Sequence, residues 1–260
     1  SAQDVDSIAL DAGDPASAFA AEATPLGTLS AQLATQTGGR INLGADGNTG
    51  RASRSAASVL QLLSLNGGQK IRAGETVSLN WRSLNAGAIV DLYWIDEAAG
   101  GAEFPIAVGV ANDGQFDWTP AAASAAARIR IATTTAGGQP LVAASHEPFA
   151  VGQAGNVYYV NDAYNAASDS YSNTAGFYLA TGTTPNDPLP SIQAVLRSYN
   201  VGSGDTFLVD AGTYATVTTI ALAAANSGLH IVGPTDAAAV LDRDNATPLQ
   251  YVLDLNNADN

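Results

Sequence analysis

The run Gly204-Asp205-Thr206-Phe207-Leu208-Val209-Asp210-Ala211-Gly212-Thr213-Tyr214 carries a short apolar strand between two turns. Further short apolar runs follow it along the chain, at 217–222, 229–232, 240–242 and 251–255. The interval from Phe207 to Ile231 is about the length of one repeat in a structure of stacked β coils. We therefore expect the C-terminal strands to pair coil on coil and to share one continuous core.

An amphipathic helix is expected upstream of this run. Ser191 follows Pro190 and precedes apolar residues at positions i, i+3, i+4 and i+7, which are Ile192, Val195, Leu196 and Tyr199. A helix here would cover the open end of the first coil and its exposed backbone edge. Before it, the sequence predicts a strand at 158–160 and a long polar loop at 163–190.

Three segments together resemble the opening cap and first rung of bacterial right-handed parallel β-helix proteins of the pectate-lyase-like kind: Tyr158-Tyr159-Val160-Asn161-Asp162, 191–196 and 204–214. Two N-terminal segments, Asp11-Ala12-Gly13-Asp14-Pro15 and 38–49, resemble the closing turns of such a helix. Asp46 is acidic where that family usually has an aromatic residue. A closing coil that precedes an opening coil implies a junction within a longer tandem array.

Residues 69–152 show the rhythm of a β-sandwich, with short strands that alternate apolar and polar positions. Trp81, Trp94 and Trp118 fall at apolar positions of three such strands, so we expect at least two of them in the core. The segments 114–120 and 128–131 resemble Ig-like modules of bacterial surface proteins and fungal wall proteins.

The expected fold class is therefore all-β: an Ig-like β-sandwich flanked by the closing coil of one parallel β-helix and the capped opening rungs of another. The expected domains are a terminal coil at 1–56, a connector at 57–68, the sandwich at 69–152, and the cap with its first rungs at 153–260. The connector is too apolar for a free linker, so we expect a strand or an extended segment that docks on the sandwich.

The amino-acid composition excludes several kinds of site and disfavours several kinds of partner. The net charge of −14 disfavours binding to nucleic acid or to anionic lipid. The absence of Cys excludes disulfides and thiolate metal sites, and no run of about 18 apolar residues predicts a membrane span. Charged residues make up 13% of the chain and Lys70 is the single lysine, a composition typical of secreted or cell-surface proteins. No signal peptide is visible and no Met is present, as in a mature or internal fragment.

Catalysis within this chain is not expected. His146 and His230 lack a serine-centred elbow motif, and we interpret both as structural or surface residues. The family resemblance implies that lyases and hydrolases of this fold use carboxylates on middle rungs. The nearest candidates here lie in the first rungs, close to the cap, and are Asp210, Asp242, Arg243 and Asp244.

Calcium is the one metal that the sequence favours, because it prefers hard oxygen ligands. The candidate ligands lie in or beside the polar loop, and are Asn161, Asp162, Asp169 and Asp187. A second group stands near the N-terminus, and comprises Asp11, Asp14, Asp46 and Asn48. Neither group has the spacing of an EF-hand or of a calcium-binding β-roll, and both are also compatible with Asx turns. Asn245-Ala246-Thr247 matches a glycosylation sequon.

The sequence thus favours a structural or adhesive module of a long extracellular or cell-surface bacterial protein, as part of a repeat that forms fibres. The expected partners are other copies or further segments of the same protein, arranged head to tail. The alternative is a fragment of a carbohydrate-active or sugar-binding β-helix protein, with polysaccharide as its partner.

Overall fold

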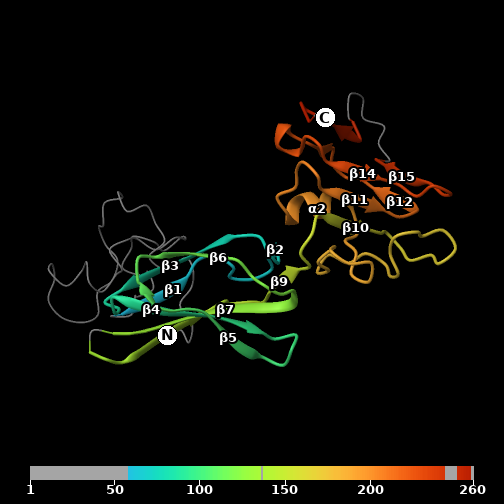
Figure 1. Cartoon of the computed structure of the whole chain (residues 1–260). Coiled ribbons are helices and arrows are strands. Elements are labelled where there is room, and N and C mark those ends of the chain that lie inside the picture. Colours follow the sequence, from blue (N-terminus) through green and yellow to red (C-terminus); the bar gives the residue numbers. More distant parts are fainter. Residues whose placement is uncertain (1–57, 136, 244–250, 259–260) are drawn as a thin grey trace, which may run out of the picture. The chain divides into compact units, whose positions relative to one another are not determined.

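The computed structural model describes residues 58–135, 137–243 and 251–258 (Figure 1). The predictions for 1–56, for Asp244 and for the sequon at Asn245 lie outside these residues. The described chain is all-β, with one short α-helix and one 3₁₀ helix, Ala224–Asn226, among its strands. It divides into two compact units: the first holds Val77–Trp118, Ala127–Pro148 and the described residues up to Gly67, and the second holds Gly68–Thr76, Thr119–Ala126 and Phe149 onward.

The first unit contains a three-stranded antiparallel sheet in the order β1-β3-β6. These strands are β1 (Val59–Leu62), β3 (Val77–Leu84) and β6 (Gln115–Trp118). All four residues of β1 are buried, and Leu62 lies opposite Trp81 in the register with β3. The apolar segment expected to dock on the sandwich therefore forms a strand of this sheet.

A second antiparallel sheet of this unit has β4 (Ile89–Asp96) between β5 (Ala102–Ala111) and β7 (Ser124–Thr134), with β8 (Pro140–Ala144) on the far side of β7. Side chains alternate between core and surface along these strands. The inward set is fully buried, and consists of Val90, Leu92, Ile129 and Ile131.

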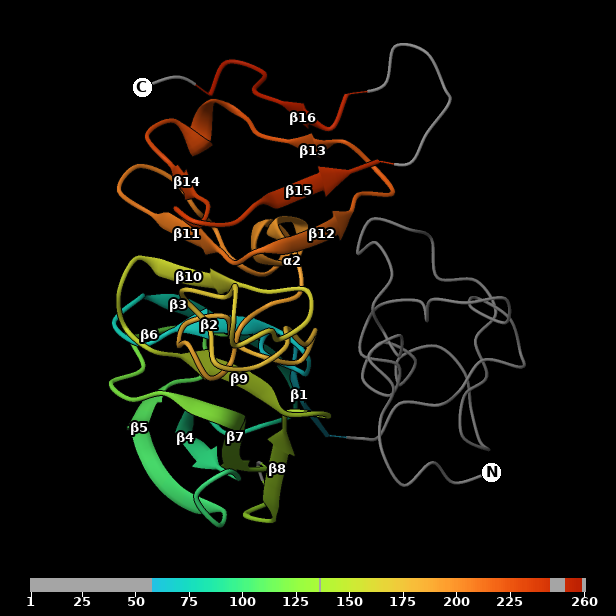
Figure 2. The same ribbon diagram turned by 90° about the vertical axis from the view of Figure 1, so that its right-hand side faces the viewer.

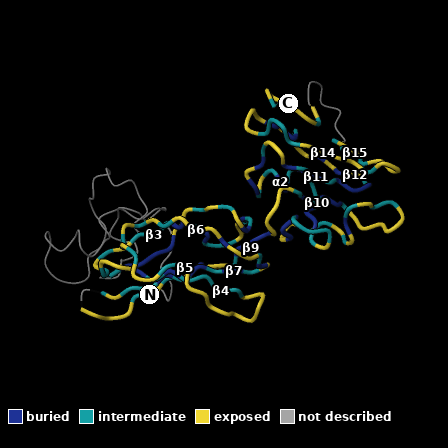
Figure 3. Tube along the Cα trace, in the orientation of Figure 1, coloured by how far each residue is buried: buried dark blue, intermediate teal, exposed yellow. Residues whose placement is uncertain are grey.

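The tryptophans join the two sheets of the first unit. Trp81 and Trp118 are buried, which confirms that at least two of the three tryptophans lie in the core. Figure 3 shows how buried, intermediate and exposed residues are distributed along the strands of this unit. Trp94 of β4 is half-buried, and its ring centroid lies 6.1 Å from that of Trp118 in β6. The Trp81 indole Nε1 donates a hydrogen bond to Asn112 Oδ1 at 2.8 Å, so its polar atom is satisfied inside the core.

In the second unit the chain passes twice through three parallel sheets in the same order (Figure 2). The first pass is β11 (Thr206–Val209), β12 (Gly212–Ala215) and β13 (Ile220–Ala221). The second pass is β14 (His230–Val232), β15 (Ala239–Asp242) and β16 (Leu253–Asp254). β10 (Val157–Val160) precedes β11 in the first sheet. Phe207 pairs with Ile231, which confirms the coil length expected from the strand spacing.

Two details of the coils differ from the sequence prediction. The strand expected at 217–222 is only β13, and Val217 is 88% exposed where the chain turns. β12 was not predicted, because Gly212 and Thr213 give it a weak strand signal. Its strand geometry comes from pairing with β15, in which Tyr214 lies opposite Leu241.

The helix α2 (Ile192–Ser198) is capped by Ser191, whose side chain accepts a hydrogen bond from Ala194 N. Its apolar face belongs to the core of the second unit: Ile192, Val195 and Tyr199 are buried, and Leu196 packs against the same cluster. This confirms the prediction for this helix.

The second unit also contains a parallel pair, β2 (Lys70–Arg72) and β9 (Phe149–Gly152). The Arg72 guanidinium lies 5.1 Å from the ring centroid of Tyr158 and 3.3 Å from Asp205 Oδ1. The Tyr158 ring also contacts Tyr199 at 4.9 Å and Phe207 at 5.6 Å between centroids. These aromatic contacts connect β2, β10, β11 and the end of α2.

Candidate functional site

The second pass of strands leaves an open edge. Among the strands that the structure describes, β14, β15 and β16 each pair on one side only. Apolar side chains along this pass are exposed by 38–63%: Ile231, Val232, Val240, Tyr251, Leu253 and Leu255. A strand that pairs on one side only among the described strands, with exposed apolar side chains along it, is a surface on which an additional strand can pair. We call β14, β15 and β16 with these side chains the outer edge.

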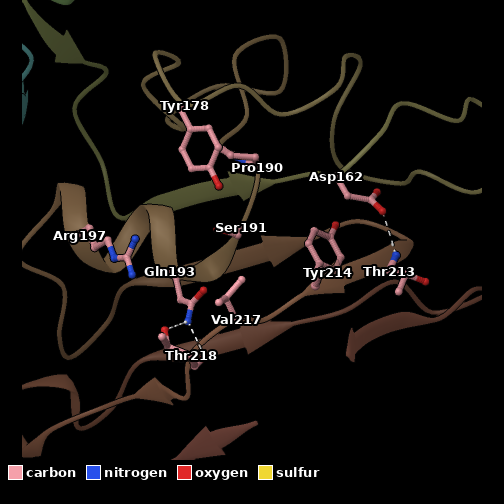
Figure 4. A pocket seen from close by; sticks show the side chains of 11 residues that line it. Asp162, Tyr178, Pro190, Ser191, Gln193, Arg197, Thr213, Tyr214, Val217 and Thr218 are labelled. Atoms are coloured by element: carbon pink, nitrogen blue, oxygen red, sulfur yellow. Dashed lines mark hydrogen bonds between the residues drawn. The ribbon is translucent and has the colours of Figure 1, made fainter. Parts of the chain in front are cut away.

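A cavity of about 440 Å³ lies between α2, β12 and the polar loop (Figure 4). Gln193 of α2 donates from Nε2 to Thr218 O at 2.7 Å and to Thr218 Oγ1 at 3.0 Å. On the loop side, Asp162 Oδ2 accepts from Thr213 N at 2.9 Å. Hydrogen bonds thus connect the elements that form the walls.

The cavity lining combines one aromatic ring with several polar groups. Tyr178 from the loop is 68% exposed and stands opposite Gln193 and Thr218 (Figure 4). The lining also includes the guanidinium of Arg197 and the carboxylate of Asp162. An exposed ring beside planar polar groups suits a ligand with an apolar face and many hydroxyls, rather than a purely apolar ligand.

A lysine supports the backbone of the loop at this ring. Lys70 Nζ of β2 donates to the carbonyl oxygen of Tyr178. Burial lowers the pKa of Lys70, and the carboxylate of Asp187 opposes this shift. The single lysine of the chain therefore serves as an anchor for the loop.

Two of the predicted calcium ligands are brought together. Asn161 is fully buried at the end of β10, and its Nδ2 donates to Asp169 Oδ2 at 3.0 Å and to Thr174 O at 2.9 Å. Asp169 Oδ2 also accepts from Asn165 N at 2.6 Å.

The other two predicted ligands lie in separate hydrogen-bond networks. Asp162 Oδ1 accepts from Ala163 N at 2.6 Å, in addition to the bond from Thr213. Asp187 Oδ2 accepts from both the amide and the hydroxyl of Thr181, each at 2.7 Å. Within the described ranges, no three His, Asp or Glu side chains are placed to share a metal ion.

The residues considered for catalysis belong to several different elements. His146 and His230 are exposed, and His230 lies in β14. Asp210 is fully buried after β11, whereas Asp242 is exposed at the end of β15. Arg243 donates from Nη1 to Thr219 Oγ1 and to Tyr251 O, each at 2.9 Å. Asp210 is the residue whose burial the sequence did not indicate, although its position directly after a buried strand is a usable signal.

Comparison with known protein families gives no match, and comparison with curated proteins gives none either. Among solved structures, the chain is similar to fibronectin(III)-like modules of Clostridium thermocellum CbhA, with 12% identity and a TM-score of 0.28 over 36% of this chain and 96% of that one. It is also similar to pectate lyase Pel3 from Pectobacterium carotovorum, with 12% identity and a TM-score of 0.23 over 68% of this chain. The match spans 54% of the lyase, or about half its length. Within the described ranges, no helix has the length and apolar character needed to cross a membrane.

Proposed function

We propose that the chain is a structural module of a long extracellular or cell-surface protein, in which coils of a parallel β-helix alternate with an Ig-like spacer. The observation that carries this proposal is the outer edge. The strands of the second pass pair in register with those of the first pass in all three sheets. The free side of each strand in a coil can therefore pair in the same way with a strand of a further coil.

The proposed occupant of the outer edge is the segment 1–56 of a second copy. Its sequence predicts a closing coil, with Ile41 and Leu43 on the buried face of a short strand. The contact is heterologous, because the edge of one copy meets a different surface of the next, and such contacts propagate into filaments.

The geometry of β14 offers a specific way to test this. His230 N donates to Asp205 O, toward β11. Backbone groups of successive residues point to opposite sides of a strand, so the N–H of Ile231 points toward the outer edge. Ile231→Pro therefore removes a donor from the edge without removing a hydrogen bond to β11.

The experiment measures the mass of the 260-residue chain by light scattering over a concentration series, together with electron microscopy. We expect concentration-dependent assembly that Ile231→Pro and the double variant Ile41→Asp, Leu43→Asp abolish. Leu179→Lys is the matched control, because Leu179 is a 74% exposed apolar residue of the polar loop and is not part of the outer edge. Monomers at every concentration would contradict the proposal.

The cavity supports a second candidate function, which is sugar binding. The carrying observation is the exposed ring of Tyr178 above hydrogen-bonding groups of α2 and β12. To test sugar binding, a glycan array is screened with the chain. The oligosaccharides that bind are then titrated by calorimetry. Tyr178→Ala should abolish binding, whereas Tyr164→Ala, which removes another exposed ring of the same loop outside the cavity lining, should leave it unchanged.

A further inference from the structure

Four side-chain oxygen atoms near the ends of β10 and β11 are buried and have no hydrogen-bond partner among the residues that the structure describes. They are Asn161 Oδ1, Asp169 Oδ1, Ser172 Oγ and Asp210 Oδ2. Asn161 and Asp210 are 0% exposed and Ser172 is 4% exposed. A buried polar atom without a partner is costly, so a group of four requires a physical explanation.

Strand register brings Asn161 and Asp210 together. Val160 lies opposite Val209 in the parallel pair β10–β11, and Asp210 N donates to Val160 O at 2.9 Å. The next residue of each strand is therefore also a neighbour of the other, with both side chains on the same face of the sheet. Both are buried, so an amide and a carboxylate stand side by side in the interior.

The polar loop folds onto these two strand ends. Asp210 Oδ1 accepts from Ser170 N at 2.6 Å and from Tyr171 N at 2.7 Å. These two amides lie between Asp169 and Ser172 in the chain, and Asp169 itself accepts from Asn161. Hydrogen bonds thus connect Asn161 to Asp169, and Asp210 to the loop amides that follow Asp169. Ser172 is the next residue of the loop after Tyr171.

The hydrogen bonds also define the orientation of the Asn161 amide. Asp169 Oδ2 and Thr174 O are both acceptors, so the group that faces them must be the Nδ2 amino group. Asn161 Oδ1 consequently points elsewhere and is an acceptor. Together with the carboxylate oxygens of Asp169 and Asp210 and the hydroxyl oxygen of Ser172, it forms a set of buried oxygen atoms that can act as acceptors.

The charge of this cluster is uncompensated by basic side chains. In the described part of the chain, no Lys, Arg or His forms an ion pair with Asp169 or Asp210. Burying a carboxylate without a cation or a proton is strongly unfavourable. The hydroxyl of Tyr214 lies nearby and donates to Asp210 O at 2.9 Å, which leaves the Asp210 carboxylate itself unneutralised.

We propose that Asn161, Asp169, Ser172 and Asp210 bind a calcium ion that fastens the polar loop to the ends of β10 and β11. The donors are hard oxygens from carboxylates, an amide and a hydroxyl, and their two negative charges match a divalent cation. Calcium fits better than magnesium, which keeps several waters and dehydrates reluctantly. The site is independent of the head-to-tail assembly, because none of its residues lies on the outer edge.

This set differs from the one that the sequence suggested. Asn161 and Asp169 are retained, whereas both carboxylate oxygens of Asp162 and Oδ2 of Asp187 accept hydrogen bonds from groups outside this cluster. Asp210 enters from the first coil, 40 residues beyond Ser170, whose amide it accepts.

The test compares thermal unfolding of the full 260-residue chain in chelator and in millimolar Ca²⁺, together with terbium luminescence excited through tyrosine. Calcium should raise the melting temperature, because it binds the folded state, and terbium should show saturable emission that calcium displaces. Asp210→Asn preserves the acceptor for Ser170 N and Tyr171 N but removes a charge. It should weaken terbium binding by about tenfold or more and abolish the calcium-dependent rise.

Asp187→Asn is the matched control from the same loop and should retain both responses. If Asp210→Asn does not fold, Asp169→Asn provides the same test, since its amide oxygen can still accept from Asn165 N. The proposal is overturned if the wild-type chain shows neither a melting shift nor terbium emission, in which case a proton or a water satisfies the cluster. It is equally overturned if Asp210→Asn and Asp169→Asn fold and respond to calcium like the wild type.

Discussion

The carboxylate of Asp162 occupies the space where a side chain at position 212 would begin, so Gly212 is the residue that lets the loop close onto β12. A Cβ atom on Gly212 would overlap Asp162 Oδ1, Oδ2 and Cγ. The next residue, Thr213, donates its amide hydrogen to the same carboxylate at 2.9 Å. One acidic side chain therefore both requires the glycine and holds the strand that follows it.

Replacing Gly212 by Ala should displace this carboxylate and break its bond to Thr213. We expect a loss of about 1–3 kcal/mol in the free energy of unfolding, as for other overpacked sites. Urea denaturation followed by circular dichroism measures it. Gly233→Ala is the control in the same unit, because a Cβ there meets Ala239 Cβ only at 3.9 Å. Equal stability of the two variants would contradict this account.

Trp81 should be the most costly tryptophan to truncate in the first unit. It is 3% exposed and its indole donates to Asn112 Oδ1, so Trp81→Ala leaves a cavity and removes a hydrogen bond. We expect a cost of about 3–5 kcal/mol. Trp94→Ala should cost less, since Trp94 is only half-buried. Denaturant unfolding of both variants gives the comparison, and a reversed order would refute the assignment of the core.

Two neighbouring tyrosines should respond in opposite ways to loss of the hydroxyl. The Tyr158 hydroxyl is buried and has no hydrogen-bond partner in the described residues, so Tyr158→Phe should be neutral or stabilising. The Tyr199 hydroxyl donates to Thr181 O at 2.7 Å, so Tyr199→Phe should cost about 1 kcal/mol. Thermal unfolding at neutral pH distinguishes the two. A destabilised Tyr158→Phe would show that its hydroxyl has a partner.

Alkaline pH should destabilise the second unit. Burial raises the pKa of Tyr158, Tyr199 and Tyr214 above the ordinary tyrosine value. A raised folded-state pKa gives stability that is present below the unfolded value of about 10 and is lost as pH rises toward the folded one. Each tyrosine should contribute a loss of about 1.4 kcal/mol per pH unit in that window. The measurement is the free energy of unfolding as a function of pH. In Tyr158→Phe the slope of this curve should be smaller by about 1.4 kcal/mol per pH unit, which is the contribution of one tyrosine.

The sequence is most informative where an element is defined by its own periodicity. The helix at Ile192–Ser198 follows from four apolar positions and an N-cap serine, and the pairing of Phe207 with Ile231 follows from the strand spacing. In both cases the spacing of apolar residues within the segment itself predicts which side chains are buried. Neighbours distant in the chain were not needed to identify these elements.

The sequence is least informative where distant contacts decide the outcome. β12 contains Gly212 and Thr213 and is a strand because β15 pairs with it. The burial of Asp210 depends on a loop that folds back onto it from Ser170 and Tyr171. Neither fact has a periodic signal, and the predicted calcium ligands were accordingly only half brought together.

The strands of the two coils pair residue for residue, but the coils differ in length. Paired residues are 24 positions apart in the first sheet (206 to 230), 27 in the second (212 to 239) and 33 in the third (220 to 253). In the sequence, the additional residues fall between the paired strands. The repeat therefore has no constant period, so a self-comparison of the sequence at any single spacing aligns one sheet and misaligns the other two. In such a chain the repeated pairing of strands is visible in the hydrogen-bond ladders, although the sequence shows no regular interval.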